Sequence, residues 1–174
     1  MTTRSSHVRV LPLNESHLPA ILEIEAASKA IIQRAGIEGL TARALGDIVG
    51  LTKLHNVRVA EADDQAIGWL AWRDESPGVA YLEELQVHPD QHRAGVAEAL
   101  LREMRAEAKK LGLQELVTRA WPNVVSAKAF LDKSGFVPLD DKSPPSVMQW
   151  RDEQAGLGKA VRVGEAILWA PVQP

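Results

Sequence analysis

The chain has 174 residues, with 20 lysines and arginines against 23 aspartates and glutamates, and 45% of its side chains are apolar. These figures are typical of a folded protein with one hydrophobic core, and they exclude a disordered chain. The net charge of −3 includes no long run of like charges, so we expect no nucleic-acid partner. The longest apolar run, near residues 166–172, is far shorter than a membrane span, so we expect no membrane partner.

The start of the chain and the absence of cysteine narrow the class of protein further. Residues 1–7 are polar and lack the apolar core of a signal peptide, which favours a cytoplasmic location. Without cysteine there is no disulfide, no thiolate metal ligand and no cysteine nucleophile. No spacing of histidine and carboxylate side chains is typical of a metal site, so we expect no metal.

The first third of the chain predicts one strand and two helices. The strand covers residues 8–13, and a helix follows over 18–30, with Pro19 in its first turn. Thr41 is a plausible N-cap for a second, short helix over 41–49. The side chains expected on the buried side of the first helix are Leu18, Ile21, Leu22 and Ala26.

Three strands then follow at hairpin spacing, over residues 57–61, 66–72 and 79–88, with polar turns at 62–65 and 74–78. The rest of the chain predicts further elements with clear end signals. These are a strongly amphipathic helix over 95–111 before Gly112, a strand over 115–120, a helix over 126–134, a helix over 144–155 capped by Ser143, and a strand over 161–169 interrupted near Gly164. With no repeat or linker, we expect a single α+β domain over residues 1–174.

The segment 82–101 carries the chemical signal. A strand ends at Val87 or His88, Pro89 stops the pairing, and a loop containing Gly95 opens the amphipathic helix. Helix N-termini attract phosphate because their first N–H groups are unpaired and carry partial positive charge. Gly95 lets the backbone approach an anion closely, and the Arg93 guanidinium can add a charge-assisted hydrogen bond.

Within this segment, His92-Arg93-Ala94-Gly95-Val96-Ala97 resembles the phosphate-binding pattern Q/R-x-x-G-x-G/A of the GNAT superfamily, the acyl-CoA-dependent N-acetyltransferases. His92 departs from that pattern, which has glutamine or arginine there. The later block from Asn123 to Phe136 resembles the superfamily's N-x-x-A…F-Y-x-K-x-G-F region, with one extra residue after Asn123. The resemblance covers residues 8–136, and the tail 137–174, with its extra helix and final strand, is less typical.

The resemblance implies a fold, a co-substrate and a binding site. The fold is a central mixed, mostly antiparallel sheet flanked by helices, in which a splayed strand pair binds acetyl-CoA. The backbone of Leu85, Gln86 and Val87 would contact the pantetheine, the loop from His92 to Ala97 would hold the pyrophosphate, and Asn123 would also contact the coenzyme.

Glu84 is the candidate general base, because many relatives carry a glutamate at this strand position and a carboxylate in a desolvated cleft can accept a proton. The alternative is a solvated strand residue. Glu83 points to the opposite face of the strand and is a weaker candidate. Glu25, at the end of a helix that borders the acceptor cleft in relatives, is a further candidate, although helix carboxylates usually face solvent.

The sequence departs from the family pattern at the residue that would act as the general acid. Leu131 stands where relatives carry the acidic tyrosine, and the sole tyrosine, Tyr81, lies at the far end of a strand. A water molecule would then protonate the thiolate, or the thiolate would leave unassisted. His88 is expected to be a surface residue near the pyrophosphate, and Trp121 a wall of the acceptor pocket.

Three functions remain open from the sequence. The first is an N-acetyltransferase that moves an acetyl group from acetyl-CoA to a primary amine of a small molecule or peptide by direct attack. The second, motivated by Leu131, is a non-catalytic acyl-CoA-binding or regulatory module. The third, motivated by the apolar last strand, is a structural dimerisation partner, and a homodimer is compatible with all three.

Overall fold

A computed structural model describes residues 7–159 and 161–173, which form two compact units. The first unit runs up to Ala71 and includes Glu84–Glu103, and the second contains Trp72–Glu83 and the chain from Met104 onward. Residues 1–6, in which we predicted no signal peptide, lie outside the described part. The prediction of a single domain over 1–174 stays a prediction.

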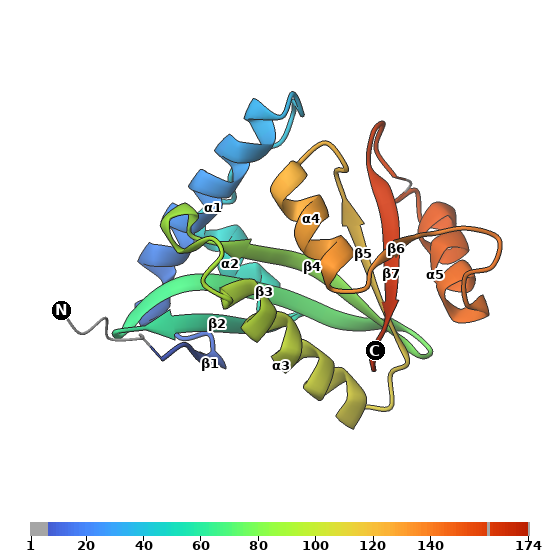
Figure 1. Cartoon of the computed structure of the whole chain (residues 1–174), viewed down its shortest axis with the longest axis horizontal. Coiled ribbons are helices and arrows are strands. Elements are labelled where there is room, and N and C mark those ends of the chain that lie inside the picture. The colour runs from blue at the N-terminus through green and yellow to red at the C-terminus, as the bar shows by residue number, and fades with distance from the viewer. Residues whose placement is uncertain (1–6, 160, 174) are drawn as a thin grey trace. The chain divides into compact units, whose positions relative to one another are not determined.

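A seven-stranded sheet has the order β1-β2-β3-β4-β5-β7-β6 (Figure 1). The strands are β1 Arg9–Pro12, β2 Asn56–Ala62, β3 Gln65–Ser76, β4 Val79–Val87, β5 Glu115–Ala120, β6 Val137–Pro138 and β7 Ala166–Pro171. The pairs β1–β2, β5–β7 and β6–β7 are antiparallel, whereas β4 and β5 are parallel. With its helices, this mixed sheet confirms the predicted α+β class.

In the first unit, α1 (Leu18–Arg34) is longer than predicted, and its buried side includes residues that we did not expect. Ile21 and Ile24 pack in a core with β2, β3 and α2, but Ala26 is exposed and Leu22 is only partly buried. Glu25 and Lys29 are buried instead. The predicted face was therefore right for Leu18, Ile21 and Leu22, which contact this core, and wrong for Ala26. Apolar periodicity does not identify the two charged side chains that are buried beside them.

The second helix, α2 (Leu45–Leu51), begins four residues later than predicted. Thr41 is therefore not its N-cap. The cap is Ala44, whose backbone N–H donates to the Asp47 carboxylate at 3.0 Å, so the helix uses an acidic side chain of its own first turn. The predicted turn at 62–65 is confirmed, with Asp63 and Asp64 at φ of 49° and 59°. The predicted turn at 74–78 is shorter, because β3 continues to Ser76.

The helix predicted most clearly, α3 (Val96–Lys110), is confirmed, and Gly112 follows it with a φ of 74°. Its N-terminal half packs closely on β3 at Gly68. A Cβ on Gly68 would lie 3.0 Å from the Gln86 carbonyl oxygen and 3.0 Å from the Val96 side chain. Only glycine leaves room for this contact, which sets the position of the start of α3 against β3 and β4 in the first unit.

In the second unit, β5 has the predicted bounds, and α4 (Val125–Lys133) begins and ends one residue before its prediction. The helix α5 (Pro145–Gly156) starts one residue late, because Ser143 does not cap it. The Ser143 hydroxyl instead accepts a hydrogen bond from the Asp140 backbone at 2.9 Å. Trp150 of α5 packs on Tyr81, with ring centroids 5.4 Å apart.

The last strand, β7, begins at Ala166 rather than at Val161, because a turn at Gly164, with a φ of 83°, precedes it. It pairs with β5 on one side and with β6, a short strand that we did not predict, on the other. The apolar residues of β7 are therefore accounted for within the sheet of a single chain. The observation that had suggested a dimerisation strand has this simpler explanation.

Two further findings concern the described residues. In 7–159 and 161–173, no helix is long and apolar enough to cross a membrane. Within the same ranges, no three histidine or carboxylate side chains are grouped in a way that could hold a metal ion.

A polar contact joins the first strand to its neighbour. Glu61 of β2 lies opposite Arg9 of β1, and its carboxylate accepts from the Arg9 guanidinium at 2.5 Å. The buried His17 ring lies 3.1 Å from the other Glu61 oxygen. The hydrogen bond from His17, followed by the contact with Arg9, holds the pKa of the Glu61 carboxyl below its ordinary value of 4.5.

This contact predicts an acid-sensitive contribution to stability. Because folding lowers the pKa of Glu61, the stabilisation is complete above pH 4.5 and is lost as the pH falls through the lower, folded value. We expect Glu61→Gln to reduce the loss of unfolding free energy between about pH 5 and about pH 3, measured by urea denaturation. Asp64→Asn is the control, since the 91% exposed Asp64 side chain also contacts Arg9. An equal acid dependence in wild type and Glu61→Gln would contradict the assignment.

Candidate active site

The first unit contains a carboxylate with no exposed surface, that of Glu25 on α1. Its Oε1 atom accepts the backbone N–H of Arg43 at 3.0 Å, and lies 3.4 Å from the Arg43 guanidinium and 3.6 Å from the Lys29 ammonium. Its Oε2 atom accepts the Gln86 side-chain amide at 2.6 Å. Glu25 therefore has a donor on each oxygen, as a buried charge requires. The sequence expectation of a solvent-facing Glu25 was wrong.

Gln86 on β4 joins this carboxylate to that of Glu84. Its Nε2 atom donates to Glu25 at 2.6 Å and to Glu84 at 2.9 Å, and its Oε1 accepts the Trp69 indole N–H at 3.0 Å. Because an indole N–H can only donate, Trp69 fixes which end of the amide is the oxygen. The amide nitrogen must then face both carboxylates. Glu84 and Gln86 share a face of β4, as strand alternation predicted.

Glu84 lies at the edge of this group, with a side chain that is 15% exposed. Its Oε1 atom is 2.5 Å from the Arg43 guanidinium and 3.8 Å from the Lys29 ammonium. Glu84 is therefore neither solvated nor alone. Glu25, Lys29, Arg43, Glu84 and Gln86, which we call the Glu25–Glu84 cluster, contain two carboxylates and two cations, so their formal charges cancel. This balance is what allows two carboxylates to share a largely desolvated site.

Sequence reasoning missed Lys29 and Arg43 as members of the cluster. Lys29 follows Glu25 by four residues on α1, which is a usable signal for a helical ion pair. Arg43 lies in the irregular connection between α1 and α2, where no periodicity indicates the direction of a side chain. The buried Glu25 could be recognised only with these partners in place.

The loop after β4 is held to the strand by its two histidines. The His88 backbone N–H donates to the Ile67 carbonyl at 2.8 Å, and its ring nitrogen accepts the Asp90 N–H at 3.2 Å, which caps a short 3₁₀ turn over Pro89–Gln91. The His92 ring lies 3.2 Å from the Val87 carbonyl oxygen, to which it donates. His92 thus fixes the loop to the end of β4.

The backbone of residues 92–97 has the geometry of an anion site. Arg93 and Gly95 have positive φ values of 68° and 76°, and Gly95 caps α3 by accepting the Ala99 N–H at 3.0 Å. The N–H groups of Val96 and Ala97 are in the first turn, where a helix supplies no acceptor. His92, Arg93, Ala94 and Gly95 are exposed, and a Cβ on Gly95 would meet no atom within 4 Å. Such an open backbone concavity suits a phosphate group.

The other predicted residues lie in the second unit. Asn123 is exposed and precedes α4, and Leu131 of α4 is buried with 6% exposure. Tyr81 is buried against Trp150, and this burial, together with the Glu83 charge, raises the pKa of its phenol far above the ordinary value of 10.0. A phenol that holds its proton so strongly is a poor acid, so Tyr81 does not replace the missing tyrosine.

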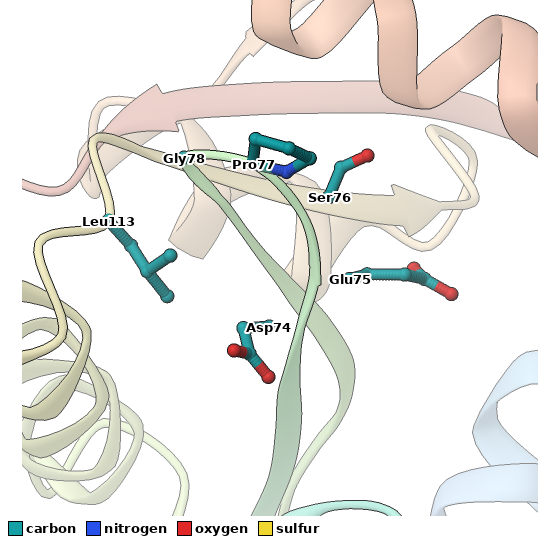
Figure 2. A pocket seen from close by; sticks show the side chains of 6 residues that line it. All are labelled: Asp74, Glu75, Ser76, Pro77, Gly78 and Leu113. Atoms are coloured by element: carbon teal, nitrogen blue, oxygen red, sulfur yellow. The ribbon is translucent and has the colours of Figure 1, made fainter.

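A surface pocket of about 350 Å³ lies at the turn between β3 and β4. Figure 2 shows its lining side chains around this turn, which are Asp74, Glu75, Ser76, Pro77, Gly78 and Leu113. Its polar groups already hold α5, because Glu75 accepts the Trp150 indole N–H at 2.8 Å and Ser76 donates to Glu153. This pocket is therefore explained by the packing of α5 in the second unit.

A family model described as an acetyltransferase (GNAT) domain matches residues 53–138. This match assigns residues 53–138 to the GNAT acetyltransferase family. The matched range runs from β2 to β6 and includes Glu84, the loop 92–97 and Asn123. No curated protein matches the sequence significantly.

Solved structures share the fold of this GNAT chain at low sequence identity. A GNAT-family acetyltransferase from Staphylococcus aureus Mu50 is 12% identical with a TM-score of 0.71, over 96% of this chain and 100% of its own. The ribosomal-protein-S18-alanine N-acetyltransferase of Escherichia coli is 17% identical with a TM-score of 0.66, over 97% and 96%. PaiA N-acetyltransferase from Thermoplasma acidophilum, solved with coenzyme A, is 18% identical with a TM-score of 0.67, over 95% and 99%. The GNAT fold is thus established for this chain.

Proposed function

We propose that this GNAT protein is an N-acetyltransferase, which transfers the acetyl group of acetyl-CoA to a primary amine of a small molecule or peptide. The observation that carries the proposal is the exposed backbone loop at residues 92–97, which follows the strand whose Glu84 and Gln86 side chains belong to the Glu25–Glu84 cluster. The structurally similar S18-alanine and PaiA enzymes are named as N-acetyltransferases, which supports the same reaction class here.

The coenzyme is proposed to bind through two backbone segments of the first unit. The amides of Arg93, Ala94, Gly95, Val96 and Ala97, together with His92, would hold the pyrophosphate, and Leu85, Gln86 and Val87 would offer backbone groups to the pantetheine. The His92 ring already donates to the Val87 carbonyl, so it would also hold the pyrophosphate loop in position at the end of the strand. For Asn123, the proposed coenzyme contact rests on the sequence motif alone.

The proposed chemistry is direct attack, with Glu84 as the general base. Glu84 takes a proton from the acceptor ammonium, and the amine nitrogen forms a bond to the thioester carbonyl carbon. The carbon–sulfur bond then breaks, the nitrogen of the new amide loses its remaining excess proton to water, and the thiolate of coenzyme A takes a proton. Leu131 cannot supply that proton, so water delivers it or the thiolate leaves unassisted.

A non-catalytic acyl-CoA-binding or regulatory module is the alternative, and the buried apolar Leu131 is the observation that favours it. Both functions need the coenzyme site, but only the transferase releases coenzyme A in response to an amine. The homodimer and the cytoplasmic location remain predictions under either function.

The coenzyme site, which both functions need, is tested with one pair of variants. We expect Gly95→Val to weaken acetyl-CoA binding by about 100-fold or more in calorimetry, because the β-branched side chain would project into the loop concavity. Gly112→Val is the matched control, since Gly112 ends the same helix with a similar φ of 74° and equal open space. Equal acetyl-CoA affinities in the two variants would overturn the coenzyme site.

The function itself is tested with wild-type protein, acetyl-CoA and a panel of primary amines, by measuring the released thiol. The transferase predicts thiol release that depends on the amine and an acetylated product in mass spectra. Tight acetyl-CoA binding with no release for any amine class would instead establish the binding module.

The role of Glu84 is tested by Glu84→Gln, which keeps the shape of the side chain but removes its ability to accept a proton. General-base contributions are typically about 10²- to 10⁴-fold, so we expect kcat/KM to fall by that factor with little change in acetyl-CoA affinity. The rise of the wild-type rate with pH should also flatten. Glu83→Gln, next to it on the opposite face of β4, is the control. Full kcat/KM in Glu84→Gln across pH 6 to 9 would discard Glu84 and favour Glu25 or a bound water as the base.

A further inference from the structure

The two cations of the Glu25–Glu84 cluster are held differently. Lys29 lies on α1 and its side chain is 11% exposed, whereas Arg43 lies in the connection between α1 and α2 and is 23% exposed. The Arg43 guanidinium reaches Glu84 at 2.5 Å, on the more exposed edge of the cluster. Of the two cations, Arg43 is therefore the one that a ligand arriving from solvent can replace.

Glu25 does not depend on the Arg43 guanidinium. Its oxygens keep the Arg43 backbone N–H at 3.0 Å, the Gln86 amide at 2.6 Å and the Lys29 ammonium at 3.6 Å if the guanidinium moves away. The backbone contact also keeps the connection anchored while the side chain swings outward. Displacement of the guanidinium therefore affects Glu84 most, since it removes the shortest contact of that carboxylate.

A cation must replace the guanidinium for the exchange to be favourable. Removing one partner of a desolvated ion pair leaves an uncompensated charge, whereas exchanging one cation for another preserves the balance of two carboxylates and two cations. An ammonium group can make this exchange, because it offers three donors and a full charge. A neutral amine can donate hydrogen bonds but cannot balance the charge of Glu84.

We propose that the Arg43 guanidinium occupies the cation subsite of the acceptor, and that the acceptor is a protonated primary amine whose ammonium exchanges with Arg43 at Glu84. This inference rests on the proposed transferase function and gives it a substrate class, alkylammonium compounds as opposed to neutral amines. The exchange delivers the reacting nitrogen directly to the proposed base. Until the amine binds, the Arg43 guanidinium stays paired with the Glu84 carboxylate. This pairing keeps the carboxylate from activating a water molecule that would hydrolyse the thioester.

The first test measures acceptor binding without chemistry. The probes are pentylamine, which is an ammonium ion at neutral pH, and aniline, which is neutral there, titrated into protein containing coenzyme A. We expect Arg43→Gln to bind pentylamine about tenfold more tightly than wild type, since the competing guanidinium is gone, and to leave the weak binding of aniline unchanged. Arg34→Gln, at an exposed position on α1, is the matched control and should behave as wild type.

Competition with free guanidinium gives a readout that a purely structural ion pair would not give. Added guanidinium chloride, compared with equal sodium chloride, should weaken pentylamine binding to Arg43→Gln because it refills the vacant subsite. In turnover, Arg43→Gln should lower the KM for pentylamine, and it should raise acetyl-CoA hydrolysis in the absence of amine. Lys29→Gln leaves the competing Arg43 guanidinium at Glu84, so it should not reproduce the sensitivity of Arg43→Gln to added guanidinium.

Several outcomes overturn the proposal. Unchanged or weaker pentylamine binding by Arg43→Gln, or the absence of competition by guanidinium, shows that Arg43 is a structural partner only. If Arg43→Gln does not fold, Arg43→Met, which also removes the charge, replaces it, and an affinity for pentylamine no higher than that of wild type counts against the exchange. The proposed transferase function and the proposed cation subsite can be disproved separately. Guanidinium-sensitive pentylamine binding without acetylation removes the transferase but not the cation subsite, whereas acetylation with an unchanged KM in Arg43→Gln removes only the subsite.

Discussion

The fully buried carboxylate of Glu25 is the constraint on which the arrangement of the first unit depends. A charge with no exposed surface must receive hydrogen bonds and a counter-charge, because an isolated carboxylate in such a place costs several kcal/mol. The donors come from three places that are distant in sequence. They are Lys29 on the same helix, Gln86 on β4, and both the backbone and the side chain of Arg43. Satisfying Glu25 therefore fixes α1, the connection to α2 and the end of β4 relative to one another.

The same requirement extends into the sheet through Gln86. Its amide can serve both carboxylates only with the nitrogen turned toward them, and the Trp69 indole N–H on β3 fixes this orientation from the other side. On the opposite face of β3, Gly68 admits the Val96 side chain at the start of α3. Neighbouring residues of one strand thus hold the polar cluster on one face and the first turn of α3 on the other.

Most of the fold could be predicted from the sequence, because its signals are local. Strand alternation placed Glu84 and Gln86 on one face, and the apolar stripe of α3 with Gly112 at its end gave that helix to within one residue. The predicted helix starts were wrong where a residue other than the expected one caps the helix. The caps of α2 and α5 use Asp47 and proline rather than Thr41 and Ser143, so their starts were misplaced.

The site was predicted less completely than the fold, and for a different reason. Gly95 and its loop follow from a short motif, whereas the burial of Glu25 depends on partners 18 and 61 residues away. No window of sequence contains that information. The burial of Lys29 on α1 was missed for the same reason. Glu25 and Lys29 each carry a charge, and they can be buried because the two charges cancel.

The cluster also links stability to reactivity. A general base has to be ionised before its substrate arrives, and in a desolvated site an ionised carboxylate persists only beside a cation. Arg43 and Lys29 supply that cation for Glu84, the proposed base, but they also contact Glu25, whose burial holds α1 in place. The backbone N–H of Arg43 separates the two tasks, because it remains on Glu25 whatever the guanidinium does. In the proposed exchange, the guanidinium can therefore leave Glu84 while the backbone N–H still contacts the buried charge of Glu25.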